Sequence, residues 1–197
     1  ALDKHAKPGA VLASNTSYLN IDEIAKVTKR PQDVLGMHFF SPANVMKLCE
    51  IVRADKTAPD ALTTAVSIAR KIAKVPAVVG VCDGFVGNRM LAQRGKQSEK
   101  LLFEGALPQQ VDAVVTKFGM PMGPLEVADT VALDICAHVA ESLGVAQDPT
   151  QGKRLRELVE KGKLGKKTGE GFYVWKDGNP ERGTTNLTPE ALLKLGE

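Results

Sequence analysis

The sequence contains no apolar run of about 18 residues, the length of a transmembrane helix, so we expect no membrane span. The first residues, ALDKHAKPGAV, lack the charged-then-apolar pattern of a signal peptide, and nothing in them indicates secretion. Cysteine is also scarce: Cys49, Cys82 and Cys136 are odd in number, widely spaced and set in apolar surroundings. This usage is typical of reduced core thiols in a cytoplasmic protein, and it favours neither a disulfide framework nor a metal site.

A strong excess of charge is absent as well. The net charge is +3, which is too small to indicate nucleic-acid binding. The apolar and charged fractions, 43% and 25%, are those of a soluble globular protein. One basic cluster runs through residues 153–167, and its default interpretation is a solvated helix face followed by a turn. Since no aromatic residue interleaves with these charges, we expect no nucleic acid as a partner.

The glycine fingerprint of a complete dinucleotide-binding fold is also missing. Such a fold normally opens with a strand, G-x-G-x-x-G and a helix. Here the only G-x-G is Gly169 and Gly171, and residue 174 is Val, while GKLGKKTG lacks the spacing of a Walker A loop. The opening LDKHAKPG resembles the last turns of a helix that has no N-cap before it. We therefore expect a strand–glycine loop–helix unit within roughly 120 residues before Ala1.

The first eighty residues alternate between strand and helix patterns. Short apolar or β-branched runs predict strands, and amphipathic periodicity predicts helices, with Asn20 as N-cap and Glu23 completing a capping box. The predicted strands are 10–14, 34–40, 46–54 and a buried strand at 76–81, and the predicted helices are 20–29 and 59–74. This alternation predicts an α/β domain with a largely parallel sheet.

After Asp83-Gly84 the pattern becomes helical. Four segments have helical periodicity, mostly closed by glycine, and the tail is a glycine-rich turn followed by a short aromatic strand. Gly95 within the first of these helices makes a break there one alternative, because glycine costs about 1 kcal/mol against alanine. The segments are 84–105, 108–119, 123–144 and 152–162, and the tail is 162–183. The sequence thus predicts an α/β domain at 1–82 and an all-α domain at 83–197.

The segment GMHFFSPANVMKLCEIV raises a chemical question, because an ordinary strand–turn–strand needs neither His38 nor Glu50. If the two strands pair, their spacing can bring the imidazole and the carboxylate together at one end of the sheet. Taken alone, such a histidine is more often structural, and Glu50 could be a solvated charge at a strand end. Other polar residues at element ends could be caps of turns or helices.

Five segments in order make the chain resemble the 3-hydroxyacyl-CoA dehydrogenases, and most of all the dehydrogenase portion of multifunctional β-oxidation enzymes. They are LASNTS, HFFSPANVMKLCEIV, DGFVGNRM, FGMPMGPLEVAD and GKKTGEGFY. The resemblance implies that 1–82 is the C-terminal part of a Rossmann-like NAD-binding domain and 83–197 the helical C-terminal domain. It implies oxidation of (3S)-hydroxyacyl-CoA to 3-ketoacyl-CoA with NAD, by a parent enzyme of which this chain is a fragment that is inactive alone.

The resemblance also assigns roles to individual residues. His38 matches the family's catalytic histidine, the base that accepts the hydroxyl proton. Glu50 matches the carboxylate that bonds the other ring nitrogen and stabilises the imidazolium. Ser17 and Asn88 match polar groups that hold the substrate oxygen. Asn15, with Ser17, lies on the loop near the nicotinamide in such folds, and no metal is implied.

Two alternatives stay open. The first is a non-catalytic fragment whose helical domain serves only oligomerisation or packing. The second is a related β-hydroxyacid dehydrogenase, but the catalytic lysine of that family has no match, because Asn88 and Arg89 stand at its motif. The resemblance implies an acyl-CoA partner and allows a homodimer, or a fused or partner hydratase and thiolase, in the cytoplasm. Attraction of CoA phosphates is the less favoured role of the basic cluster at 153–167.

Overall fold

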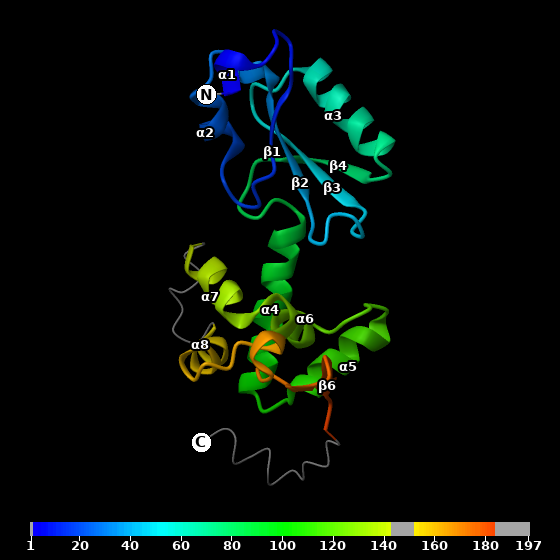
Figure 1. Cartoon of the computed structure of the whole chain (residues 1–197), viewed down its shortest axis with the longest axis vertical. Coiled ribbons are helices and arrows are strands. Elements are labelled where there is room, and N and C mark those ends of the chain that lie inside the picture. The colour runs from blue at the N-terminus through cyan, green and yellow to red at the C-terminus, as the bar shows by residue number, and fades with distance from the viewer. Residues whose placement is uncertain (1, 143–151, 184–197) are drawn as a thin grey trace. The chain divides into compact units, whose positions relative to one another are not determined.

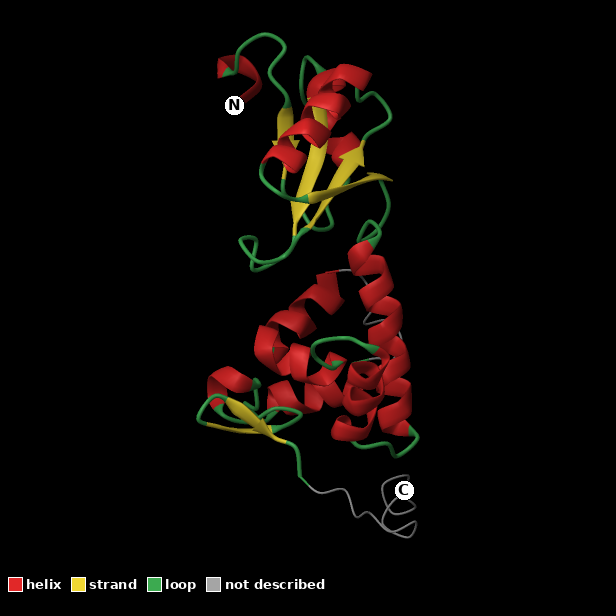
Figure 2. Cartoon of the chain, turned by 90° about the vertical axis from the view of Figure 1, so that its right-hand side faces the viewer, coloured by secondary structure: helices red, strands yellow, loops and turns green. Residues whose placement is uncertain are grey.

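The computed structural model describes residues 2–142 and 152–183 (Figures 1 and 2). The chain divides into two compact units, Ala1–Leu91 and Ala92–Glu197. The first is an α/β unit and the second is largely helical, which confirms the predicted fold class.

The first unit is built on a four-stranded sheet whose spatial order follows the chain. Its strands are β1 Leu12–Ser14, β2 Val34–Phe39, β3 Leu48–Arg53 and β4 Val75–Gly80. The pairs β1–β2 and β3–β4 are parallel, whereas β2 and β3 are antiparallel. The sheet therefore departs from the largely parallel prediction at one pair, because the connection 40–47 is too short for the helical crossover that parallel strands need.

Helices cover both faces of this sheet. Helix α2 Ile21–Lys26 packs on one face and α3 Pro59–Lys71 on the other, and the unit also contains α1 Leu2–His5 and the 3-10 turn η1 Pro31–Asp33. Asn20 caps α2, since its side-chain oxygen accepts the N–H groups of Asp22 at 2.8 Å and Glu23 at 3.3 Å. The N-cap predicted for this helix is therefore present, although the helix is shorter than the 20–29 expected.

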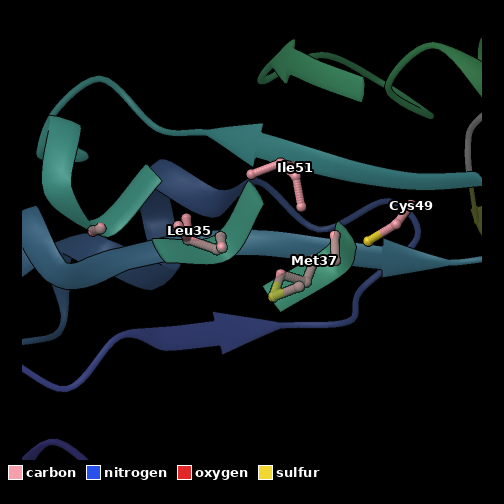
Figure 3. Close-up of a cluster of buried hydrophobic side chains, with 7 residues drawn as sticks. Leu35, Met37, Cys49 and Ile51 are labelled. Carbon is pink, nitrogen blue, oxygen red and sulfur yellow. The ribbon is translucent and has the colours of Figure 1, made fainter. Parts of the chain in front are cut away.

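Alternation along the strands separates two apolar clusters. One lies against α3, and Figure 3 shows its strand residues Leu35, Met37, Cys49 and Ile51. The other lies against α2 and collects the side chains of Ile21, Ala25, Val34, Val52, Ala54 and Phe85. The two clusters fix the register of β2 against β3, because a slip of one residue would exchange the faces.

The prediction that 76–81 is a buried strand is wrong. Strand β4 lies at one edge of the sheet, where Val75 is 59% exposed and Val78 is 52% exposed. The β-branched composition predicted the strand correctly. It did not reveal the position in the sheet, because edge and central strands can share the same residue types.

Most of the described part of the second unit is helical. Its elements are α4 Gly87–Phe103, which begins in the first unit, α5 Pro108–Phe118, α6 Pro124–Val131, α7 Leu133–Ser142, α8 Lys153–Glu160, the 3-10 turn η3 Lys166–Thr168, and the hairpin of β5 Val174–Lys176 with β6 Asn179–Glu181. Helix α4 continues through Gly95 without a break. None of the helices in the described part has the length and apolarity to span a bilayer.

The single helix predicted for 123–144 is wrong in one respect. The chain breaks between α6 and α7 at Ala132, whose φ of 94° lies outside the helical region. The Ala132 N–H still bonds to the carbonyl of Ala128, which closes α6 before α7 begins. Apolar periodicity continues across the break, so the sequence pattern did not show it. Residues 143 and 144 lie outside the described part.

Two buried carboxylates hold the tail against the helices. Asp112 accepts the N–H groups of Leu125 and Glu126 and the Tyr173 hydroxyl, at 2.8–2.9 Å. Asp129 accepts the N–H groups of Phe172 and Tyr173 and the Trp175 indole N–H, each at 2.9 Å. Two effects raise the pKa of Tyr173 well above its usual range: burial is the larger, and the hydrogen bond to Asp112 is the second. Tyr173 and Trp175 of the segment GKKTGEGFYVW are therefore part of the core of the helical unit, and Phe172 packs against it.

Candidate active site

His38 and Glu50 face each other across the antiparallel pair β2–β3. The register pairs these two residues directly, so their side chains lie on the same face of the sheet. Nδ1 of His38 lies 2.7 Å from Oε2 of Glu50, and the two residues are only 3% and 1% exposed. The pairing that the spacing in the sequence allowed is thus present. A carboxylate can only accept, so Nδ1 carries the proton and donates to Glu50.

The second carboxylate oxygen of Glu50 meets the start of α4. Oε1 accepts the backbone N–H groups of Val86 at 3.0 Å and Gly87 at 2.8 Å. These amides have no partner within the helix, and the helix dipole favours negative charge at this end. A buried carboxylate is costly unless it is fully hydrogen-bonded. Here both oxygens have hydrogen-bond partners, which offset the cost of burying the side chain.

Two aromatic rings enclose the imidazole of His38. The Phe40 ring centroid lies 4.5 Å away with an interplanar angle of 48°, and that of Phe85 lies 5.8 Å away at 57°. Phe85 is fully buried and has a φ of 49°, a conformation uncommon for a residue with a side chain. The backbone between β4 and α4 therefore turns sharply where it reaches the His38–Glu50 pair.

Asn15 is joined to the same region. It follows β1, and its side-chain oxygen accepts the N–H of Phe39, the residue after His38, at 2.9 Å. Because β1 and β2 run parallel, Asn15 and His38 both lie at the carboxyl end of their strands. Open α/β sheets bind ligands at this edge, so the position fits a nicotinamide cofactor. Within the described residues, no group of three or more His, Cys, Asp or Glu could hold a metal ion.

Ser17 and Asn88, the other two predicted site residues, have a weaker structural link to the His38–Glu50 pair. Ser17 is half-buried in the turn after β1, where the Thr16 hydroxyl caps the turn by accepting the N–H groups of Tyr18 and Leu19. Asn88 is half-buried in the first turn of α4, beside Gly87. Among the bonds described for residues 2–142, neither side chain joins the network of His38 and Glu50. The roles of Ser17 and Asn88 stay predictions.

The sequence patterns did not reveal the groups that enclose the pair. These are the amides of Val86 and Gly87 and the rings of Phe40 and Phe85. The segment DGFVGNR carried a signal for the amides, because a glycine-rich turn before a helix presents free N–H groups. The ring contacts had no such signal, since apolar patterns do not distinguish a core phenylalanine from one that packs on a histidine.

Two family models match the chain. The NAD binding domain of 3-hydroxyacyl-CoA dehydrogenase matches residues 1–82, and the C-terminal domain of 3-hydroxyacyl-CoA dehydrogenase matches residues 84–175. The (S)-3-hydroxybutyryl-CoA dehydrogenase of Ralstonia eutropha has a similar structure, with a TM-score of 0.80 and 35% identity. That similarity covers 89% of this chain and 64% of the other.

Curated relatives are similar over nearly the whole chain. The peroxisomal bifunctional enzyme of Danio rerio is 39% identical over 98% of this chain, and the fatty acid oxidation complex subunit alpha of a Psychrobacter species is 40% identical over 95%. The chain spans only 28% and 27% of the length of these two proteins. The family models, the similar structure and the curated relatives thus agree. The chain belongs to the 3-hydroxyacyl-CoA dehydrogenase family.

Proposed function

We propose that this chain supplies the catalytic base and the helical domain of an NAD-dependent dehydrogenase that oxidises (3S)-hydroxyacyl-CoA to 3-ketoacyl-CoA. The observation that carries the proposal is the buried His38–Glu50 pair at the carboxyl end of the parallel strands, in a chain of this family. A buried imidazole fixed by a carboxylate is the arrangement that general-base chemistry at a hydroxyl requires.

Removal of the proton from the substrate hydroxyl is the first requirement of the reaction. The proton must leave as the hydride leaves C3, and NAD, when bound, supplies the hydride acceptor. With Nδ1 of His38 bonded to Glu50, the free lone pair is on Nε2, which takes the proton. The Glu50 carboxylate then stabilises the imidazolium through a short contact in a region shielded from water.

The remaining residues orient the reactants. Asn15 and Ser17 lie after β1 and would contact the cofactor, with Asn15 fixed by its bond to the Phe39 N–H. Ser17 and Asn88 would hold the substrate oxygen and stabilise the charge that develops on it.

Substrate, partners and compartment belong to the proposal as well. An acyl-CoA is the proposed substrate, and a homodimer, or a hydratase and a thiolase on the same chain or as partners, are the proposed associations. The relatives are named as a bifunctional enzyme and as a complex subunit, which supports such an assembly. The cytoplasm is the proposed compartment because all three cysteines are free thiols, although one relative is named as peroxisomal.

Replacement of the base tests this function. The assay needs NAD binding, so we would fuse the chain to the first half of the NAD-binding domain of a relative. His38→Gln should lower the rate by about 10²–10⁴-fold, or roughly 3–5 kcal/mol of barrier, because glutamine cannot accept the proton at neutral pH. His5→Gln, at an exposed position of α1, is the matched control. Equal rates for the two variants would support the non-catalytic alternative.

A further inference from the structure

Gly87 lies where α4 begins, and it touches both partners of His38. Its N–H donates to Oε1 of Glu50 at 2.8 Å, while its Cα faces the ring of Phe40. A Cβ at this position would lie 2.6 Å from Cζ and 3.0 Å from Cε1 of Phe40. Real Cβ atoms do not approach other atoms so closely, so any larger residue must displace the ring or the helix.

Glycine is required at position 87 because a side chain has no space there, and not because of its backbone conformation. Gly87 does not have the positive φ that would itself demand glycine, since it is the first helical residue of α4. Alanine would be the better helix former at such a position. The next nearest atom to an added Cβ is Oε1 of Glu50 at 3.7 Å, an ordinary contact. Phe40 is therefore what excludes a side chain at position 87.

Phe40 in turn packs on the imidazole. Its ring centroid lies 4.5 Å from that of His38, closer than the ring of Phe85 at 5.8 Å. A shift of the Phe40 ring would uncover one side of the imidazole or rotate it. A shift of α4 would instead lengthen the bonds from Val86 and Gly87 to Glu50. Either displacement would change the surroundings of the His38–Glu50 pair.

We propose that Gly87 and Phe40 act together as positioning residues for His38, with Gly87 allowing the start of α4 and the Phe40 ring to approach the His38–Glu50 pair at the same time. Neither residue touches the reacting atoms. The activity part of the inference rests on the proposed function, whereas the packing part concerns only this chain.

The packing part is tested on the chain itself by NMR of the His38 ring. In Gly87→Ala the ring-proton shifts and their dependence on pH should change, because the neighbouring aromatic ring and the bonds to Glu50 are displaced. The matched control is Gly80→Ala in the same unit, where an added Cβ meets no atom within 4 Å. Unchanged His38 signals in Gly87→Ala, at an unchanged circular-dichroism spectrum, would overturn the proposal.

The activity part uses the fusion enzyme and a second substitution. Gly87→Ala should lower kcat by up to about 10²-fold with little change in KM, as expected for a catalytic group misplaced by about 1 Å. Phe40→Leu removes the ring atoms that a Cβ would meet, so Gly87→Ala should have little further effect on kcat in that background. Equal losses in both backgrounds would overturn the joint positioning role. If Gly87→Ala alone fails to fold, the double variant should fold, and its failure would also overturn that role.

The NMR and activity experiments together distinguish a failure of the proposed function from a failure of the positioning role. Changed His38 signals together with a fusion that is inactive even without substitutions would contradict the proposed function and leave the packing part standing. An active fusion that is indifferent to Gly87→Ala would contradict the positioning role alone.

Discussion

Tyr173 joins two buried carboxylates of the helical unit, through its hydroxyl to Asp112 and its N–H to Asp129. Tyr173→Phe leaves Asp112 with one donor fewer. We expect the free energy of unfolding to fall by about 1–3 kcal/mol at pH 7, the usual cost of a buried group that loses its partner. Urea unfolding followed by the fluorescence of Trp175, the only tryptophan, measures the loss. No change in midpoint would mean that the hydroxyl bond is energetically neutral.

The same residue gives the protein a dependence on alkaline pH. Burial raises the pKa of Tyr173 above that of a tyrosine in the unfolded chain, which is about 10. The unfolded state therefore loses this proton first, and the stabilisation is fully present below pH 10 and decreases as pH rises above it. Between pH 9 and pH 11, wild type should lose more unfolding free energy than Tyr173→Phe. Parallel losses in the two proteins would contradict the assignment.

Cys49 offers a test of burial in the first unit. Its side chain is fully buried against α3, and burial raises the pKa of its thiol. Alkylation by iodoacetamide at pH 8 should therefore be much slower at Cys49 in the folded chain than in urea, because the reagent needs an accessible thiolate. Peptide mass spectrometry identifies the site. Equal rates in both conditions would show that the apolar cluster against α3 is open to solvent.

At the scale of elements, two glycines of the helical unit should respond in opposite ways to the same substitution. Gly119 ends α5 with a φ of 119°, which disfavours any side chain, whereas Gly95 lies inside α4 with open space around its Cα. Gly119→Ala should destabilise the unit by about 1 kcal/mol, and Gly95→Ala should stabilise it by a similar amount. Thermal unfolding of the two variants compares them directly. The same sign for both would contradict the described positions of Gly95 within α4 and Gly119 at the end of α5.

The sequence predicted most elements because their signals are local. Asn20 before an amphipathic run predicted the start of α2, and glycine at 119 predicted the end of α5. Position within the fold depends on contacts that are distant in sequence, so the edge location of β4 and the break at Ala132 were not visible. The same limit applies to the site. The spacing of His38 and Glu50 indicated their contact, but the path that brings the amides of Val86 and Gly87 to Glu50 depends on tertiary structure.

At the scale of the whole molecule, the chain carries only part of what its relatives contain. It spans about a quarter of their length, and its described sheet begins at β1 without a glycine-rich phosphate loop. The boundary predicted near residue 83 stays a prediction. The family models divide the chain between 82 and 84, and the compact units divide it after Leu91, within α4.

Cofactor binding by the isolated chain is the corresponding test. The phosphates of NAD need the glycine loop and the helix start that follows it. Isothermal titration of the chain with NAD should therefore detect no binding, whereas the fusion to the first half of the domain should bind. The fusion with Glu23→Gln, a surface carboxylate of the same unit, should bind equally well. Tight binding by the chain alone would show that these residues form a complete cofactor site.

The central claim is that His38 and Glu50 act as one catalytic unit, and the pH dependence of kcat/KM for oxidation tests it most directly. The fusion enzyme would be compared with His38→Gln, Glu50→Gln and the double variant. Glutamine at position 50 removes the charge that stabilises the imidazolium, so the rate should fall and the alkaline rise of activity should move to lower pH. The double variant should be little slower than His38→Gln. Multiplicative losses, with no shift of the profile in Glu50→Gln, would contradict the claim.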